Sequence, residues 1–209
     1  MGLDQQSHPS RRPAFVRGLT DEGVASLGRG DALTFDSTLE GDVAQRVRVT
    51  ALRMDQSGAL RAAGVGPHAV RRPAIRGDHI AWLDPSNLPQ GLAPVISLFE
   101  DLMQALNESA YLGARTLECQ IAVYHHGHGY ARHRDATTPA SSRRATAIYY
   151  ANPWQAGDGG ELEVWEDAGS RVLAPLGDRM VVFRSQCTEH AVHPVAGAPR
   201  VAVSAFMHN

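Results

Sequence analysis

The sequence predicts a mainly β protein with N-terminal helices, built as a double-stranded β-helix (jelly roll) that those helices buttress. From residue 118 onward apolar residues recur with period two, and Gly, Pro and Asp separate the runs. This pattern is typical of many short strands in a sandwich or jelly roll. Before residue 113 the clearest periodicity is helical. Helices first and strands afterwards favour helices that cover one sheet.

The N-terminal part gives the weaker signals. Residues 1–13 are polar and are predicted to be a disordered tail, and residues 14–36 predict no element. Ser37 and Glu40 have the spacing of a capping box, ahead of apolar residues at helical spacing, so we expect a helix at about 40–56. Residues 59–75 predict a loop or an irregular strand pair, and residues 75–84 predict a strand.

The clearest helix follows Pro94, where a wide apolar stripe continues to Leu106 and Gly113 lies beyond the end. The strands are expected at about 118–124, 144–151, 161–166, 171–174, 178–183, 190–194 and 200–208. We therefore expect one domain at residues 14–209, with a helical and loop part at 14–113 and a β-helix core at 114–209.

The composition of the chain excludes some classes of function. The chain has 209 residues, of which 43% are hydrophobic, and a net charge of -2, so no nucleic-acid or membrane partner is indicated. No apolar run approaches the roughly 18 residues of a membrane span, and no secretory leader is visible. The two cysteines form no Cys-x-x-Cys pair, so we expect a reducing compartment, the cytoplasm. The oligomeric state stays open.

His133 and Asp135 form a His-x-Asp pair, and His190 begins a β-rich tail. Residues i and i+2 of a strand point the same way, so the pair can reach one metal, with His190 from another strand as third ligand. A His-x-Asp pair alone also arises by chance in surface loops. Two histidines and one carboxylate are the triad of non-haem Fe(II) oxygenases, whereas a structural zinc site takes four ligands.

The last predicted strand has one apolar face and one face that mixes an arginine with small residues and a phenylalanine. Val201, Val203, Ala205 and Met207 alternate with Arg200, Ala202, Ser204 and Phe206. If the second face looks into a barrel, Arg200 can bind the carboxylate of a ligand, and Tyr124 and Tyr150 can assist it. The alternatives are a solvent-facing arginine at a strand start and tyrosines that only pack at a sheet edge.

Several segments together carry a family resemblance. They are residues 75–82 (IRGDHIAW), Tyr124 with 129–135 (GYARHRD), 147–150 (AIYY), 159–162 (GGEL) and 190–194 (HAVHP) with Arg200. In this order the chain resembles the prolyl hydroxylases of the 2-oxoglutarate/Fe(II) dioxygenase superfamily, in the branch of the hypoxia-inducible-factor prolyl hydroxylases and their bacterial relatives. The spacing from His190 to Arg200 is slightly longer, and the connection around residues 152–154 shorter, than in the animal enzymes.

The resemblance implies roles for single residues. His133, Asp135 and His190 would bind Fe(II). Arg200 and Tyr150 would hold the distal carboxylate of 2-oxoglutarate, in a pocket that Tyr124 also lines. Towards the substrate, Arg76 and Asp78 would stabilise each other near a mobile loop at residues 64–72, and Phe206 would form part of the wall by the iron.

The implied activity is hydroxylation of a prolyl residue in a protein or peptide, as in a prolyl 4-hydroxylase. It would use Fe(II), 2-oxoglutarate and O2, release succinate and CO2, and take ascorbate as an additional cofactor. Some bacterial relatives act on translation elongation factor Tu. The alternatives are the same chemistry on a small molecule or free amino acid, and a non-catalytic cupin-like binding or sensing module.

Overall fold

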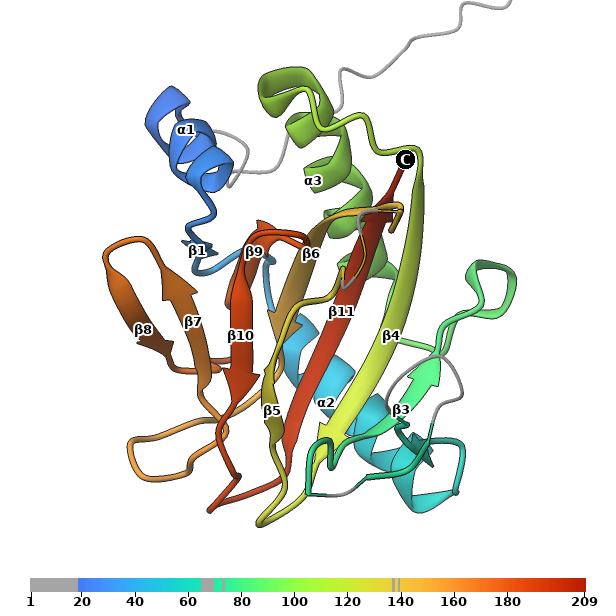
Figure 1. The fold of residues 1–209 in the computed structure, drawn as a ribbon. Coiled ribbons are helices and arrows are strands. Elements are labelled where there is room, and N and C mark those ends of the chain that lie inside the picture. Colours follow the sequence, from blue (N-terminus) through green and yellow to red (C-terminus); the bar gives the residue numbers. More distant parts are fainter. Residues whose placement is uncertain (1–18, 65–69, 73, 137, 139) are drawn as a thin grey trace, which may run out of the picture.

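Two antiparallel sheets face each other in the computed structural model, which describes residues 19–64, 70–72, 74–136, 138 and 140–209 (Figure 1). The larger sheet has the strand order β1-β9-β6-β11-β4-β3-β2 and the smaller one β5-β10-β7-β8. This arrangement confirms the predicted jelly roll. The predicted tail and the central part of the predicted mobile loop, residues 65–69, lie outside the described residues.

The helices are α1 (Asp21–Arg29), α2 (Val43–Gln56), α3 (Ala93–Ala110) and the short 3-10 helix η2 (Pro85–Asn87). The strands are β1 (Leu33–Phe35), β2 (Arg61–Ala62), β3 (His79–Trp82), β4 (Thr116–Tyr124), β5 (Tyr130–His133), β6 (Arg143–Tyr150), β7 (Leu162–Glu166), β8 (Gly169–Leu173), β9 (Met180–Arg184), β10 (Glu189–Val192) and β11 (Arg200–His208). None of the described helices combines the length and hydropathy that a membrane crossing requires.

Both predicted helices and all seven predicted C-terminal strands are present, but the predicted capping box is wrong. α2 begins at Val43 behind Asp42, whose side chain makes no capping hydrogen bond. Ser37 instead lies in a turn with φ +53°, and Gly41 (φ +73°) redirects the chain again before the helix. The predicted strand at 75–84 is shorter, because its regular pairing is confined to β3.

Four of the described elements were not predicted: α1, β1, β5 and the short 3-10 helix η2. α1 begins where the Thr20 hydroxyl accepts a hydrogen bond from the Gly23 N–H, and it ends at Gly30 in the left-handed conformation. β1 then pairs with β9 at the edge of the large sheet. β5 pairs with β10, which opposes His133 to His190.

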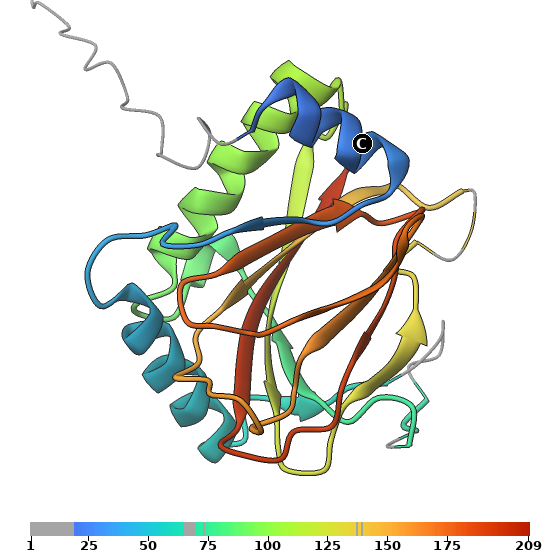
Figure 2. The ribbon, with the colours of Figure 1, turned by 90° about the vertical axis from the view of Figure 1, so that its left-hand side faces the viewer.

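The large sheet has an apolar core on each face. The helices cover its outer face, as Figure 2 shows for α2 and α3. One face of β11 enters that helix-side core through Val201, Val203, Ala205 and Met207. The other face, with Ala202, contacts the second core between the two sheets. The face separation predicted for β11 is confirmed, and the space between the sheets holds the candidate site.

Candidate active site

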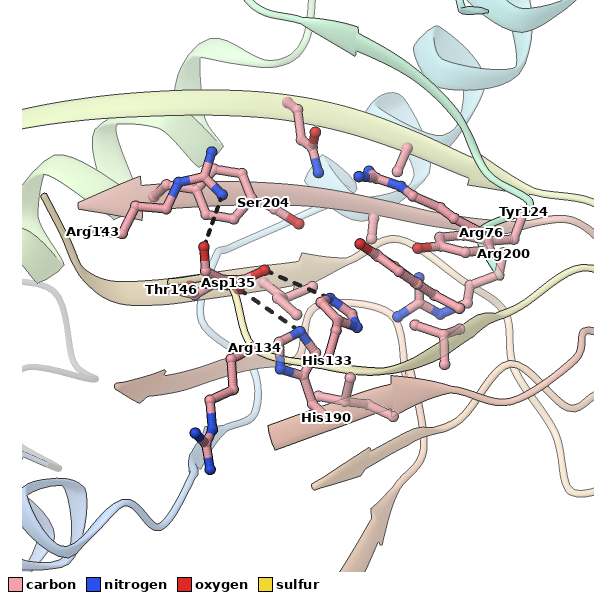
Figure 3. A pocket seen from close by; sticks show the side chains of 18 of the residues that line it. Arg76, Tyr124, His133, Arg134, Asp135, Arg143, Thr146, His190, Arg200 and Ser204 are labelled. Atoms are coloured by element: carbon pink, nitrogen blue, oxygen red, sulfur yellow. Dashed lines mark hydrogen bonds and ion pairs between the residues drawn. The ribbon is translucent and has the colours of Figure 1, made fainter. Parts of the chain in front are cut away.

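The site is a pocket of about 390 Å³ between the two sheets. Its floor is the inner face of β4, β11 and β6, and β5 and β10 close the opposite side. Ala202 and Ser204 lie on this floor, so the small residues of β11 leave the space that the alternation predicts. Polar groups concentrate at the two ends of the pocket (Figure 3).

At one end His133, Asp135 and His190 come together, with their potential ligand atoms within 4.8 Å of one another. The Nε2 atoms of both histidines lie 3.7 Å from the Asp135 carboxylate, His133 facing Oδ1 and His190 facing Oδ2. These separations are longer than a hydrogen bond. Figure 3 shows both rings pointing toward Asp135. β5 ends at His133, so Asp135 belongs to the bend beyond the strand.

The backbone sets which ring nitrogens face Asp135. His133 Nδ1 lies 2.8 Å from the Ala131 carbonyl oxygen, and His190 Nδ1 lies 3.4 Å from that of Thr188. A carbonyl can only accept a hydrogen bond, so Nδ1 of each ring carries the proton. The unprotonated Nε2 atoms are then left facing the space beside Asp135, as metal-ligating histidines require.

Burial and charge fix the protonation states. Burial lowers the pKa of His190 from 6.5 to about 4, which keeps its imidazole neutral at pH 7. Burial alone would raise the pKa of the Asp135 carboxyl. Its interactions with His190, His133 and Thr146 outweigh that effect and hold the pKa well below its usual range. A neutral imidazole and an ionised carboxylate are the forms that bind a divalent cation.

A short chain of hydrogen bonds holds the Asp135 carboxylate in position. The buried Thr146 hydroxyl donates to Asp135 Oδ2 at 2.7 Å. Thr146 Oγ1 also lies 2.9 Å from the hydroxyl oxygen of the fully buried Ser185. Because the Thr146 proton goes to Asp135, Ser185 is the donor in this second bond. Sequence reasoning assigned no role to Thr146 or to Ser185.

At the other end of the pocket Arg200 lies between two tyrosines. The Arg200 side chain is 4% exposed, and its guanidinium carbon is 4.9 Å from the ring centres of both Tyr124 and Tyr150. Its Nε donates to the Gly160 carbonyl at 2.8 Å. Gly160 has φ +73°, and a Cβ there would press on the arginine, so the glycine permits this approach.

Hydrogen-bond donors that an anion could use gather at this end. The buried Tyr150 hydroxyl has no hydrogen-bond partner among the described residues. Burial raises the pKa of both Tyr124 and Tyr150, so both phenols keep their protons and can donate. A carboxylate beside Arg200 would satisfy the unpaired Tyr150 hydroxyl. The sequence predicted the proximity of these three residues, and the structure brings them together.

Arg76 and Asp78 form a bidentate ion pair, with Nε to Oδ1 at 2.7 Å and the second contact at 2.9 Å. Asp78 is buried behind the pocket, while Arg76 lines it and lies over the Tyr130 ring. Tyr130 in turn stacks on His133, with ring centres 3.6 Å apart. The pair therefore supports the metal-side histidine through Tyr130, a contact that sequence reasoning missed.

Aromatic and cationic side chains surround Phe206 at the pocket edge. The Trp82 ring centre is 5.8 Å from that of Phe206, and Trp82 is 53% exposed. The Arg143 guanidinium covers Phe206 at 3.9 Å, and its Nη1 also donates to the Asp135 carbonyl. Sequence reasoning placed Phe206 in this wall, but it did not find Trp82 or Arg143.

The other polar residues near the triad have partners elsewhere. The His193 Nε2 pairs with Glu163 at 2.9 Å, and His126 Nδ1 lies 3.0 Å from the Ala196 carbonyl. Arg134 points away from Asp135 in Figure 3, and one of its terminal nitrogens lies 3.6 Å from Glu189. His193 and Arg134 therefore lie outside the His133, Asp135 and His190 cluster.

Comparisons with known proteins agree with this geometry. The family model described as 2OG-Fe(II) oxygenase superfamily matches residues 119–208. A Pseudomonas putida prolyl-4-hydroxylase is 28% identical with TM-score 0.83, covering 93% of this chain and 100% of that chain. A Trichoplax adhaerens prolyl hydroxylase, solved with a hypoxia-inducible-factor oxygen degradation domain peptide, is 26% identical with TM-score 0.81, covering 92% of this chain and 90% of that one.

The fold alone is more widely shared. The carbocyclase SnoK of nogalamycin biosynthesis is 13% identical with TM-score 0.71, covering 94% of this chain and 87% of its own. The superfamily implies Fe(II), 2-oxoglutarate and O2, and the described residues contain the His-Asp-His cluster that such a metal needs. Residues 119–208 therefore match the 2OG-Fe(II) oxygenase superfamily, and together with the likeness in fold to two prolyl hydroxylases this match supports a 2-oxoglutarate- and Fe(II)-dependent dioxygenase.

Proposed function

We propose that this enzyme hydroxylates a prolyl residue in a protein or peptide, consuming O2 and 2-oxoglutarate and releasing succinate and CO2. One observation carries the proposal: the likeness to two prolyl hydroxylases extends over at least 92% of the chain, well beyond the oxygenase domain. It includes the N-terminal part that supplies Arg76, Asp78 and Trp82 to the surroundings of the pocket.

We assign His133, Asp135 and His190 as the ligands of Fe(II). The assignment rests on the unprotonated Nε2 atoms of the two histidines and on the ionised carboxylate of Asp135. Each Nε2 atom lies 3.7 Å from that carboxylate. Fe(II) together with 2-oxoglutarate supplies the activation of O2. The protein contributes by holding the two rings through their Nδ1 protons and the carboxylate through Thr146.

We assign Arg200, Tyr150 and Tyr124 to 2-oxoglutarate. A guanidinium binds a carboxylate through two parallel hydrogen bonds, and Arg200 is anchored at Nε with its terminal nitrogens remaining for that purpose. Tyr150 would donate to the same carboxylate, which gives its unpaired hydroxyl a partner. Because this end is buried, few waters compete with the ligand.

The substrate would enter past Phe206. Trp82, Phe206 and Arg143 form an apolar rim with one fixed cation, which suits a pyrrolidine ring flanked by peptide carbonyls. Arg76 and Asp78 would then fix the segment that leads from the loop at residues 64–72, of which 65–69 lie outside the described residues. The peptide in the Trichoplax structure supports a peptide substrate for this pocket.

Three finer parts belong to the same proposal. Elongation factor Tu is the first protein to test as a substrate, because bacterial relatives act on it. Ascorbate is expected to support repeated turnover. A cytoplasmic location accords with two free cysteines and with the composition.

The test is incubation of the enzyme with Fe(II), 2-oxoglutarate, O2 and proline-containing proteins, elongation factor Tu first. Mass spectrometry locates added oxygen, and succinate is measured in parallel. Asp135→Ala serves as the inactive control. The proposal requires one oxygen atom on a prolyl residue with matching succinate, dependent on Asp135.

Two other outcomes would each overturn a defined part of this proposal. Hydroxylation of a free amino acid or small molecule, with none in proteins, would leave the dioxygenase and refute the protein substrate. Metal and 2-oxoglutarate binding with no succinate from any substrate would favour a binding or sensing module.

A further inference from the structure

A second group of two histidines and one carboxylate lies outside the active site. Asp55 Oδ1 is 2.8 Å from His79 Nδ1, and Asp55 Oδ2 is 2.8 Å from His125 Nε2. The two imidazole rings stand edge to face with centres 5.3 Å apart. One potential ligand atom from each residue lies within 4.8 Å of the others. Two nitrogens and one carboxylate thus lie close enough together to share one ion.

Three elements supply these residues. Asp55 lies in the last turn of α2, His79 begins β3, and His125 directly follows β4. His79 pairs with Val123, whose side chain belongs to the helix-side core, whereas Tyr124 belongs to the core between the sheets. Because side chains alternate, His79 and His125 point to the helix side, away from the pocket. The cluster therefore lies behind the 2-oxoglutarate end of the pocket.

The Asp55 charge has no permanent counter-charge. Its side chain is 10% exposed, and its partners in the described part of the chain are these two histidines. A shielded carboxylate is costly unless a cation compensates it, and a neutral imidazole supplies only a hydrogen bond. A divalent ion at the meeting point would neutralise Asp55.

The donor set also selects the class of ion. Imidazole suits zinc and its transition-metal neighbours, whereas magnesium and calcium prefer oxygen ligands. The His79 and His125 side chains are 33% and 37% exposed, so water can reach the remaining coordination positions. With metal–nitrogen bonds of about 2.0–2.1 Å, neighbouring ligand atoms stand roughly 3–3.5 Å apart. The present contacts need to open by less than about 1 Å.

We propose that Asp55, His79 and His125 form a second metal site, which binds a divalent transition-metal ion such as Zn²⁺. The ion joins α2 to β3 and to the end of β4. Tyr124 and Asp78 are the chain neighbours of His125 and His79, so the site would hold the backbone that carries both. This site is independent of the substrate and of the reaction.

The test is metal stoichiometry in the full chain without an affinity tag. Asp135→Ala/His190→Ala removes the active-site ligands, and we expect this variant to bind one Zn²⁺ in calorimetry and native mass spectrometry. Adding His125→Ala should remove that equivalent or weaken its affinity at least about tenfold, because a lost ligand costs no less than a lost outer-shell partner. Asp55→Asn, which keeps the side-chain shape, should do the same.

His126→Ala is the matched control, because His126 is the adjacent histidine and lies outside the cluster. It should retain the ion, and Co²⁺ substituted for Zn²⁺ should give a visible spectrum that His125→Ala abolishes. Circular dichroism confirms that each variant is folded. The proposal is overturned if the double variant binds no Zn²⁺, or if His125→Ala and Asp55→Asn bind it as tightly as His126→Ala does.

Discussion

Thr146→Val tests whether the hydrogen-bond chain behind Asp135 matters for iron binding. Valine has nearly the shape of threonine but lacks the hydroxyl that donates to Asp135 Oδ2 at 2.7 Å. Thr146 is 1% exposed, so water cannot replace the lost donor. The carboxylate would then be free to turn away from the two Nε2 atoms. Thr146 is a positioning residue in this account and touches no metal.

The expected magnitude follows from the charge of the acceptor. A hydrogen bond to a charged group contributes about 1.5–3 kcal/mol. Loss of an outer-shell partner weakens metal affinity by about 10–100-fold, or about 1.4–2.7 kcal/mol. The two ranges agree, so we expect Thr146→Val to raise the Fe(II) concentration for half-saturation by roughly 10–100-fold.

The assay is anaerobic titration with Fe(II) at saturating 2-oxoglutarate, following the visible charge-transfer band of the chelate. That band reports the active site and not the second metal site. Thr38→Val is the matched control, because Thr38 also donates to a carboxylate, that of Asp178, at 3.0 Å and away from the pocket. Unchanged half-saturation in Thr146→Val, or an equal change in Thr38→Val, would refute the reasoning.

Three further predictions follow from the same site. Asp135→Ala should abolish succinate formation, since it removes a ligand and its charge; wild-type turnover would exclude Asp135 from the site. Arg200→Ala should raise the 2-oxoglutarate requirement on the order of a hundredfold or more, since a desolvated partner charge is lost; an unchanged KM for 2-oxoglutarate would point to another basic group. The metal-free protein should lose stability as the pH falls from 6.5 to 4, because unfolded His190 binds a proton in this range while the folded form, with a pKa of about 4, does not. The loss is at most about 3 kcal/mol, and chemical unfolding at several pH values should show a smaller loss in His190→Gln.

Local patterns predicted the C-terminal half well. Strand alternation depends on neighbouring residues alone, so the two faces of β11 could be assigned before the fold was known, and Arg200 with Ala202 and Ser204 faces the pocket. The pairing of His133 with His190 could be expected only as a consequence of the metal hypothesis. β5 itself was missed because its four residues give too short an alternation.

The missed features depend on contacts distant in sequence or on backbone turns. The capping box failed because the left-handed turns at Ser37 and Gly41 precede the helix start. Ser185 meets Thr146 across 39 positions, and no spacing rule connects them. The contact of His125 with Asp55 could not be predicted, because Asp55 lies 70 positions earlier on another element. Such groups become visible only when the fold brings them together.

The most direct test of the central assignment is anaerobic titration of the metal-free wild-type protein with Fe(II) and 2-oxoglutarate. The account predicts that the charge-transfer band appears, saturates at one Fe(II) per active site and weakens strongly in Arg200→Ala. A folded protein that forms no band would contradict the assignment of the His133, Asp135 and His190 cluster and of the arginine pocket beside it.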